Sequence, residues 1–210
     1  MNQTALHFPS VIESVVATQR NGPLIAAAAV LWIKDTDKVL DVTYGRGLFW
    51  ADYRPADLTT HDLAIDGVDF RKLPHDNRTF DVVVFDPPYI VQGGRDTSNV
   101  QDFMSRYGLV DVPTTVSGLD DLISTGLAEA SRVLAPGGRL FVKCCDFVSS
   151  GRYVAGRHKV VGWALELGLE QVDEFVHYSG TGPQPKRLRQ LHSRRAHSFL
   201  CIFQKGKPRD

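Results

Sequence analysis

Short apolar runs predict the first strands of a sheet. Residues 39–42 form an apolar run interrupted by Asp41 and followed by a glycine-containing turn. Residues 81–85 place three consecutive valines and a phenylalanine after an acid, and residues 58–61 leave room for a short strand between the two. Continuous β-branched runs of this kind are typical of parallel strands covered on both faces. The pattern therefore predicts a buried sheet.

Stretches with apolar residues at helical spacing alternate with these strands. The clearest, residues 119–134, carries its apolar residues on one stripe and is followed by the breakers of residues 136–138. Further helices are expected at residues 11–18, 24–33 and 154–167, and further strands at residues 139–143, 169–178 and 198–204. Alternation of strands and helices implies a mostly parallel sheet with helices on both faces, in which ligands bind at the carboxyl ends of the strands.

Length and composition fit one compact unit. The chain has 210 residues, 43% hydrophobic and 23% charged, which is close to globular averages and excludes disordered, collagen-like and coiled-coil classes. No apolar run approaches the roughly 20 residues of a membrane span, and residues 24–33 lack the features of a signal peptide. We expect a cytoplasmic protein without membrane contact. Its single domain, 1–210, would have a helical extension at 1–23, a substrate loop at 90–118 and a basic loop at 179–197.

The three cysteines carry no metal or disulfide signature. Cys144, Cys145 and Cys201 are odd in number and lack the spacing of metal ligands, and adjacent cysteines rarely bridge each other. We therefore expect free thiols in a reducing compartment and no metal site.

The zero net charge conceals an uneven distribution. Residues 175–210 carry eight Lys and Arg against one Asp, so the remainder of the chain is acidic. A basic stretch of this kind attracts the phosphate backbone of a nucleic acid, whereas a solvated loop that only improves solubility is the alternative. The candidate nucleic-acid-binding residues are Lys186, Arg187, Arg189, Arg194 and Arg195.

The turn after the first strand is a candidate ligand site. Gly45 and Gly47 lack side chains, so a ligand could approach this backbone closely, although the full dinucleotide fingerprint with a third glycine is absent. Asp62 lies 21 residues after Asp41, an offset that suits an acid accepting hydrogen bonds from two ribose hydroxyls; a surface aspartate is the alternative.

Two further residues are candidates for the adenine of a nucleoside. Asp69 could accept a hydrogen bond from an exocyclic amine, and the adjacent Phe70 could cover the ring; an ordinary turn acid is the alternative.

The sharpest signal is the tetrapeptide Asp86, Pro87, Pro88 and Tyr89, which ends a buried strand. Two prolines cannot extend the hydrogen-bond ladder and fix the backbone direction, so the Asp86 carboxylate and the Pro87 carbonyl become rigidly aimed acceptors. Such acceptors suit an amine donor, and Tyr89 offers an aromatic face on which a nucleobase could stack. Residues 90–118 follow as a long, polar stretch with four glycines, which favours a lid or substrate clamp.

Residues 86–89 resemble motif IV of the amino-methyltransferases that use S-adenosylmethionine and methylate the exocyclic nitrogen of adenine or, less often, of cytosine or guanine. Residues 39–47 resemble motif I of that family, and Asp62 and Asp69 stand where the family places its ribose-binding and adenine-binding acids. The resemblance covers roughly residues 24–204. Motif IV is fairly specific to the chemistry, whereas motif I is specific only to the cofactor fold.

The resemblance implies an α/β, Rossmann-like class I methyltransferase fold. Its sheet would be mostly parallel and seven-stranded, with helices on both faces and an antiparallel last strand. The implied cofactor is S-adenosyl-L-methionine. The implied cofactor-binding residues are Asp41, Thr43, Tyr44, Gly45, Gly47, Asp62, Asp69 and Phe70, and the implied catalytic residues are Asp86, Pro87, Pro88 and Tyr89.

Two features depart from the family pattern. The stretch from Gly47 to Leu58 contains Pro55 and is short for the helix that usually follows motif I. No segment has the size of a separate target-recognition domain, so residues 90–118 and the basic loop would have to supply specificity.

The function implied is methylation of adenine N6 in DNA, with nucleic acid as partner and DNA favoured over RNA. An amino-methyltransferase acting on adenine or guanine of ribosomal or transfer RNA is an alternative, as is a nucleic-acid-binding protein with an inactive methyltransferase fold. Amide-methylating relatives usually carry Asn where this chain has Asp86, which disfavours a protein-glutamine substrate.

Overall fold

The computed structural model describes residues 11–89, 91, 113–180, 191–193 and 195–206. Seven strands form one sheet in the order β1-β8-β9-β5-β4-β2-β3, and two more form a separate hairpin, β6-β7. The strands are β1 (Val15–Ala17), β2 (Lys38–Asp41), β3 (Asp57–Thr60), β4 (Phe80–Phe85), β5 (Leu134–Cys144), β6 (Phe147–Ser149), β7 (Arg152–Val154), β8 (Leu169–Tyr178) and β9 (His197–Lys205). The helices are α1 (Gly22–Trp32), the short 3₁₀ helix η1 (Leu48–Trp50), α3 (Val116–Val133) and α4 (Gly156–Glu166).

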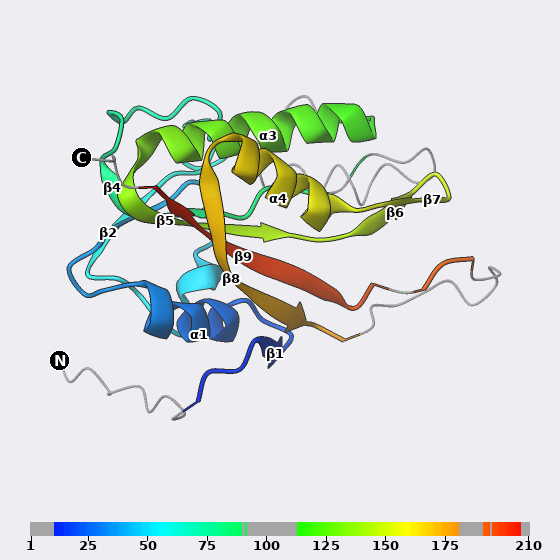
Figure 1. Ribbon diagram of the computed structural model, residues 1–210, viewed down its shortest axis with the longest axis horizontal. Coiled ribbons are helices and arrows are strands. Elements are labelled where there is room, and N and C mark those ends of the chain that lie inside the picture. Colours follow the sequence, from blue (N-terminus) through cyan, green and yellow to red (C-terminus); the bar gives the residue numbers. More distant parts are fainter. Residues whose placement is uncertain (1–10, 90, 92–112, 181–190, 194, 207–210) are drawn as a thin grey trace.

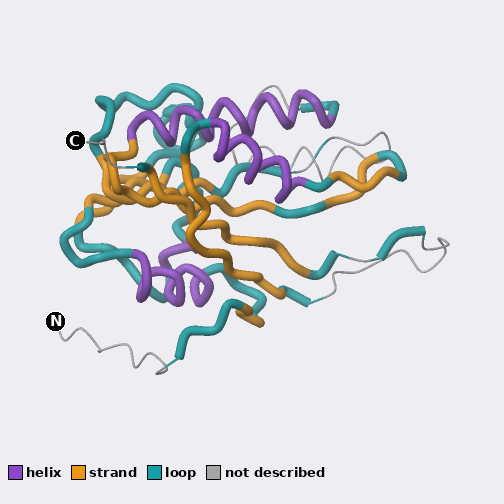
Figure 2. Tube along the Cα trace, viewed as in Figure 1, coloured by secondary structure: helices purple, strands orange, loops and turns teal. Residues whose placement is uncertain are grey.

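The sheet is mostly parallel and is covered on both faces. Strands β1 and β8, β3 and β2, β2 and β4, and β4 and β5 pair in parallel, whereas β9 runs antiparallel to both of its neighbours, β5 and β8. Helices α3 and α4 lie on one face and α1 lies on the other (Figures 1 and 2). The expected architecture, including the antiparallel last strand, is therefore confirmed.

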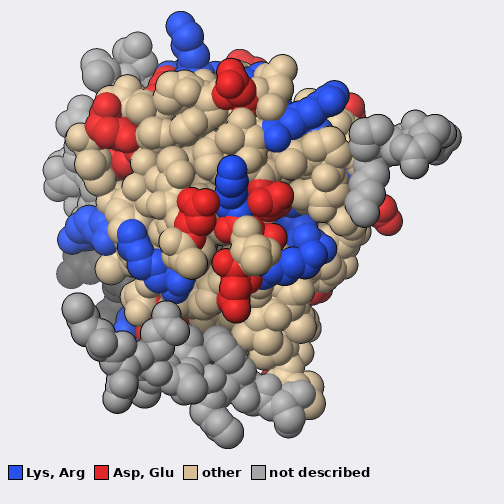
Figure 3. Space-filling model, turned by 90° about the vertical axis from the view of Figure 1, so that its left-hand side faces the viewer, with Lys and Arg blue, Asp and Glu red and all other residues tan. Residues whose placement is uncertain are grey.

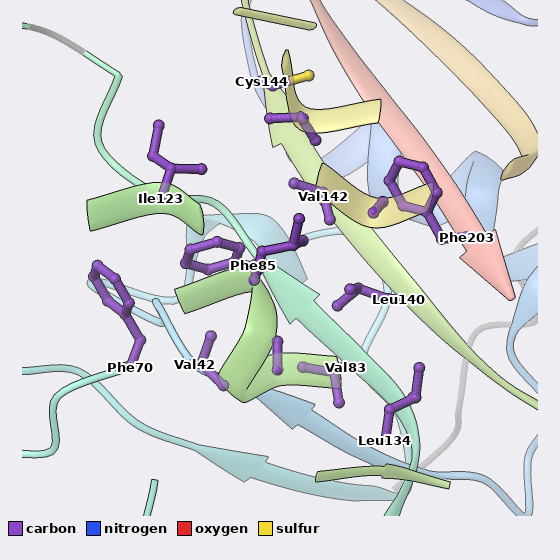
Figure 4. Close-up of a cluster of buried hydrophobic side chains, with 14 of the residues drawn as sticks. Val42, Phe70, Val83, Phe85, Ile123, Leu134, Leu140, Val142, Cys144 and Phe203 are labelled. Atoms are coloured by element: carbon purple, nitrogen blue, oxygen red, sulfur yellow. The ribbon is translucent and has the colours of Figure 1, made fainter. Parts of the chain in front are cut away.

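The unbroken apolar run of β4, residues 82–85, is explained by the packing of both faces of this strand. Val83 and Phe85 pack into the cluster beneath α3 and α4, which Figure 4 shows in close-up, while Val82 and Val84 pack into the cluster beneath α1 and η1. Because successive strand residues point to opposite faces, a strand covered on both faces needs an unbroken apolar run. The corner that follows this strand is thus held by a strand fixed from both sides.

The breakers of residues 136–138 lie inside β5 rather than before it. Phe80 of β4 pairs with Leu134, but Val82 pairs with Arg139, so β5 bulges over the intervening residues. A side chain at Gly138 would come within 2.8 Å of the Asp81 carbonyl oxygen, which is too close for any residue but glycine. The strand therefore begins five residues earlier than the predicted 139–143, and the register is restored before the strand reaches the site.

The predicted helix at residues 11–18 is wrong. Val15–Ala17 forms strand β1, which extends the sheet in parallel to β8, and Ser14 accepts a hydrogen bond from the backbone of Val176 at 2.7 Å. Val16 packs against the cluster beneath α1, so the apolar residues of this segment serve a sheet edge and a helix together. The predicted helical extension at 1–23 is thus partly a strand, and residues 1–10 lie outside the described part.

The hairpin β6-β7 has no counterpart among the predicted elements. Its strands are only three residues each, and Ser150 and Gly151 at the turn have φ angles of 47° and 74°. Positive φ at both central residues is the geometry of a tight hairpin turn. Three residues are too few to show the alternation of a strand, so only the turn residues could have indicated this hairpin.

The surface at the end of the sheet where β5 begins carries charges of both signs. Figure 3 views the end at which β5 begins, and there Lys and Arg side chains are interspersed with Asp and Glu. Interspersed charge favours solubility over binding of a polyanion. In the described part of the chain, none of the helices is both long enough and apolar enough to cross a membrane.

Candidate functional site

The turn after β2 is shaped by two glycines with left-handed backbone. Gly45 and Gly47 have φ angles of 52° and 70°, and the Gly47 amide donates to the Tyr44 carbonyl at 2.9 Å. A side chain at Gly47 would meet the Tyr44 hydroxyl at 2.5 Å. Both positions therefore require glycine, and the predicted close-approach turn is present.

Asp41 organises this turn from behind. Its carboxylate accepts hydrogen bonds from the Thr43 amide at 2.9 Å and from the Trp50 indole at 2.7 Å, and its side chain is buried. Burial raises the pKa of Asp41 to about 7, although the bonds from Thr43 and Trp50 oppose this effect. Asp41 does not line the adjoining cavity, so the structure places it as a support for the residues that do.

Asp62 joins the same turn from the end of β3. Its carboxylate accepts from the Gly45 amide and from the Ala64 amide, both at 2.9 Å, and it is buried. Asp62 and the turn enclose a cavity of about 500 Å³ at the carboxyl ends of the strands. The cavity is lined by Asn21, Thr43, Tyr44, Gly45, Arg46, Leu48, Phe49, Asp62, Ile65 and Asp86.

The Asp86 corner is tied to the turn by a hydrogen bond. The Asp86 amide donates to the Thr43 hydroxyl at 2.8 Å, and the Tyr89 hydroxyl donates to the Asp86 carboxylate at 3.1 Å. Burial raises the pKa of Asp86, while the neighbouring charge of Lys143 and the Tyr89 hydrogen bond lower it. The structure thus brings together Thr43, Gly45, Asp62 and Asp86, which the sequence had singled out separately.

A second cavity, of about 620 Å³, adjoins this corner at Tyr89. Tyr89 lines it, whereas Asp86 lines the first cavity, so residues 86–89 stand between the two. The lining of the second cavity comprises Tyr89, Lys143, Cys145, Asp146, Phe147, Val148, His177, Ser179, His192, Ser193, Arg195, His197 and Ser198.

Two buried polar residues of this second cavity were missed by sequence reasoning. The Lys143 side chain is 5% exposed, and its ammonium donates to the Asn21 side chain at 2.7 Å. His177 is 4% exposed, with Nε2 at 2.8 Å from the Thr18 carbonyl oxygen. A cation that directly follows the apolar run of residues 140–142, at the carboxyl end of a buried strand, is the signal that could have identified Lys143.

The structure does not bring Asp69 and Phe70 to either cavity. Asp69 forms a bidentate ion pair with Arg71, with a shortest distance of 2.6 Å, and this pairing lowers the pKa of Asp69. Phe70 is buried against Phe85 (Figure 4), and the centroids of the two rings are 5.2 Å apart. The first cavity does have an apolar lining, which includes Ile65, an exposed turn residue that no periodicity marks.

One of the five predicted nucleic-acid-binding cations lies within the described residues. Arg195 stands 4.8 Å above the Tyr153 ring of hairpin β6-β7 and donates to the Ser193 carbonyl at 2.6 Å. His192 contacts the Gly151 carbonyl oxygen at 2.9 Å, so the end of the basic loop packs on this hairpin. The positions that lie outside the described residues are Lys186, Arg187, Arg189 and Arg194, together with most of the predicted substrate loop. Among the described residues, no cluster of His, Cys, Asp and Glu could hold a metal ion.

No protein-family model matches the sequence, and neither does any curated protein. Solved structures do match the fold. A candidate methyltransferase from Bacillus halodurans has a TM-score of 0.52 at 13% identity, over 88% of this chain and 98% of that one. The [4+2]-cyclase SpnF has a TM-score of 0.53 at 13% identity, over 88% and 81% of the two chains.

A weaker match is a candidate DNA modification methylase from Thermus thermophilus. In its complex with S-adenosyl-L-methionine it has a TM-score of 0.40 at 15% identity, over 82% of this chain and 57% of that one, so the match spans little more than half of its length. Since one well-matched neighbour is a cyclase, similarity at this level does not determine the reaction. It does establish the fold: the chain has the Rossmann-like class I methyltransferase fold.

Proposed function

We propose that this protein is an S-adenosylmethionine-dependent methyltransferase that acts on the exocyclic amine of a nucleobase, adenine N6 of DNA. The observation that carries the proposal is the position of the Asp86–Tyr89 corner between two cavities. A methyl donor on one side and a planar base on the other would meet at the Asp86 carboxylate.

The first cavity fits the cofactor in size and in chemistry. About 500 Å³ lies within the range of small-molecule sites. The fixed carboxylate of Asp62 can accept from ribose hydroxyls, because each of its oxygens has a lone pair beyond the one used by a backbone amide. Ile65 offers an apolar surface for a purine ring. When bound, the cofactor supplies an electrophilic methyl group on a sulfonium.

The chain's own residues supply orientation and charge. An exocyclic amine is a poor nucleophile, because its lone pair is delocalised into the ring. Hydrogen bonds from the amine to the Asp86 carboxylate and the Pro87 carbonyl would favour a pyramidal nitrogen with a localised lone pair, and a fixed arrangement of this kind can contribute several kcal/mol. The Tyr89 ring would hold the base by stacking.

The second cavity supports a nucleic-acid substrate. His192, Arg195 and His197 line it together with Tyr89, which combines cationic and aromatic groups around one opening. A base within a duplex is out of reach, so the enzyme would flip it into this cavity or act on single strands. Contacts between phosphates and the basic loop would offset the cost of a few kcal/mol. Adenine in DNA is favoured by the resemblance of residues 86–89 to motif IV of the amino-methyltransferases.

Mass spectrometry of nucleosides tests this function directly. The protein is incubated with cofactor that carries a deuterated methyl group. Each reaction also contains one nucleic acid: duplex DNA, single-stranded DNA, ribosomal RNA or transfer RNA. We expect deuterated N6-methyladenine in DNA, and at most about a hundredth as much with the Asp86→Ala variant. A labelled cytosine or guanine would change the base, and label only in RNA would change the polymer. If no substrate is labelled and calorimetry detects no cofactor binding, the protein is instead an inactive, nucleic-acid-binding member of this fold.

A further inference from the structure

The register of the sheet places a buried lysine beside the Asp86 carboxylate. Strands β4 and β5 run parallel, and Phe85 pairs with Val142. The next residue along each strand is Asp86 on one and Lys143 on the other, so the two stand side by side at the carboxyl edge. Lys143 lines the second cavity and Asp86 lines the first, so the two residues stand where the two cavities adjoin.

The ammonium group of Lys143 is held in place by two neighbours, Asn21 and Phe49. It donates to the Asn21 side chain at 2.7 Å and lies 5.6 Å from the centre of the Phe49 ring. A lysine that is 5% exposed has lost most of its hydration, and buried lysines are rare unless they are paired. One neutral amide and one aromatic face compensate this loss only in part, so the charge needs a nearby carboxylate.

We propose that Lys143 is a positioning residue whose fixed positive charge keeps the Asp86 carboxyl group ionised and able to accept a hydrogen bond from the amine of the substrate. This inference rests on the proposed function for its consequence in catalysis. The electrostatic relation between the two side chains stands on the structure alone.

The other groups around Asp86 show why a cation is needed. Burial raises the pKa of Asp86, and Asp41 on β2, whose own pKa is raised by burial and by the nearby charge of Asp86, supplies no positive charge to this corner. Cys145, at the end of β5, is neutral at physiological pH because burial raises the pKa of its thiol to about 11. Burial also lowers the pKa of His177 on β8, with the charge of Lys143 as a further cause, so this imidazole supplies no fixed charge.

Tyr89 donates one hydrogen bond to Asp86 and Lys143 contributes the opposing charge. Without that charge, burial would favour the protonated carboxyl. A protonated carboxyl donates through its hydroxyl and has fewer acceptor sites for an amine. Without the charge of Lys143, we therefore expect the site to keep its shape but to be active only at higher pH.

Three variants of the full-length protein separate this role from a structural one. Lys143→Met keeps the length of the side chain and removes the charge, and Lys143→Arg keeps the charge. Lys205→Met is the matched control, because Lys205 is also partly buried and donates to the Ser131 and Leu134 carbonyls at 2.6 and 2.9 Å, far along β9 from the site.

The first readout does not depend on methyl transfer. The Asp side chains are labelled with ¹³C, and the Asp86 resonance is assigned by its absence in Asp86→Asn. An adjacent opposite charge usually lowers a carboxyl pKa by about one to three, so we expect the pKa of Asp86 to rise by about one or more in Lys143→Met. It should stay near the wild-type value in Lys143→Arg and Lys205→Met. An unmoved Asp86 titration in a folded Lys143→Met protein overturns the proposal.

The second readout is the pH dependence of kcat on a substrate identified by the nucleoside assay. In Lys143→Met the acid limb should move to higher pH, so that kcat is about tenfold or more lower below the limb and recovers at alkaline pH. A loss that is equal at every pH overturns a positioning role. If wild-type protein methylates nothing, the proposed function fails, but the titration still decides whether Lys143 keeps Asp86 ionised.

Discussion

The two cavities on either side of the Asp86–Tyr89 corner are built from different kinds of sequence. Most of the lining of the first lies between Thr43 and Phe49, with Asp62 and Ile65 added from the next loop. The second is assembled from the end of β5, the β6-β7 hairpin, the end of β8 and the residues around the start of β9. The lining of the first cavity is therefore set mainly by residues close together in the sequence, and the lining of the second by the order of the strands in the sheet. Each should respond to substitution without disturbing the other.

Asp86 lines the first cavity at the corner that leads to Tyr89 of the second, and its loss should have the largest effect. Asp86→Ala removes the acceptor aimed at the amine, and we expect methyl transfer to fall by about 10²–10³-fold or more, the cost of losing a preorganised electrostatic group. Cofactor affinity should change little, because Asp62 and the Gly45 turn remain. Radiolabelled methyl transfer and calorimetry measure the two quantities. Asp81→Ala, at the opposite end of β4, is the control, and unchanged turnover in Asp86→Ala would refute the role of this carboxylate.

Asp62→Ala should damage the first cavity alone. It removes the acceptor of the Gly45 and Ala64 amides and the candidate acceptor for ribose hydroxyls. Loss of a hydrogen bond to a charged group costs about 1.5–3 kcal/mol, so we expect cofactor affinity to fall about 10–100-fold, with nucleic-acid binding unchanged. Asp57→Ala, at the exposed start of β3, should alter neither. Equal losses of cofactor and nucleic-acid affinity in Asp62→Ala would show that the cavities are not independent.

The pH dependence of stability reports on Asp41, which supports the first cavity. Burial raises the pKa of Asp41 from 3.8 to about 7, so between these values the folded chain binds a proton that the unfolded chain releases. Stability should therefore fall as the pH rises through this window, by up to about 1.4 kcal/mol per pH unit, and the contribution should be constant above about pH 7.

Urea unfolding of wild type and Asp41→Asn at several pH values isolates this term. The wild type should lose stability relative to the variant between about pH 4 and pH 7, the window set by the raised pKa. Asp121→Asn on α3 serves as the control. Stability curves of wild type and Asp41→Asn that stay parallel throughout would contradict a protonated Asp41 in the folded state.

The smallest effect is expected at the rim of the second cavity. Arg195→Ala removes one cation, and we expect nucleic-acid affinity to fall a few-fold, with the slope of log affinity against log salt reduced by about one. Cofactor affinity should be unaffected. Fluorescence anisotropy with a labelled oligonucleotide over a salt series measures the affinity and the slope. Arg71→Ala is the control, because the Arg71 side chain is paired with Asp69. An identical salt slope in Arg195→Ala would remove this residue from the interface.

The contrast between the cavities also explains what the sequence could predict. The strand-end acid, the glycine turn and the tetrapeptide are contiguous signals whose chemistry is set by neighbouring residues, and Gly45, Asp62 and Asp86 were accordingly located. The antiparallel last strand was expected only from the family resemblance, whereas the glycine turn, the tetrapeptide corner and the sheet covered on both faces follow from the residue pattern itself. The last three are features that periodicity and turn chemistry encode directly.

Long-range features were beyond the same reasoning. Lys143 and His177 read as ordinary strand residues, because only the insertion of β9 between β5 and β8 brings their strand ends to one opening. Phe70 was predicted to contact a ligand, but its ring packs in the core against Phe85, in space left by the missing side chain of Gly126. Val15–Ala17 read as helical, because a three-residue edge strand is too short to show alternation and is stabilised by pairing with β8.

The position of β9 has a consequence for how the molecule is made. Strand β9 follows β8 along the chain yet lies between β8 and β5. Until residues 197–205 leave the ribosome, β5 presents an open edge, and neither β8 nor β1 can dock. A nascent chain could thus form the first cavity early, whereas the second cavity forms only after β9 has inserted between β5 and β8. During this interval the bare β5 edge is the place where chaperones, or a neighbouring nascent chain, would find an unpaired strand.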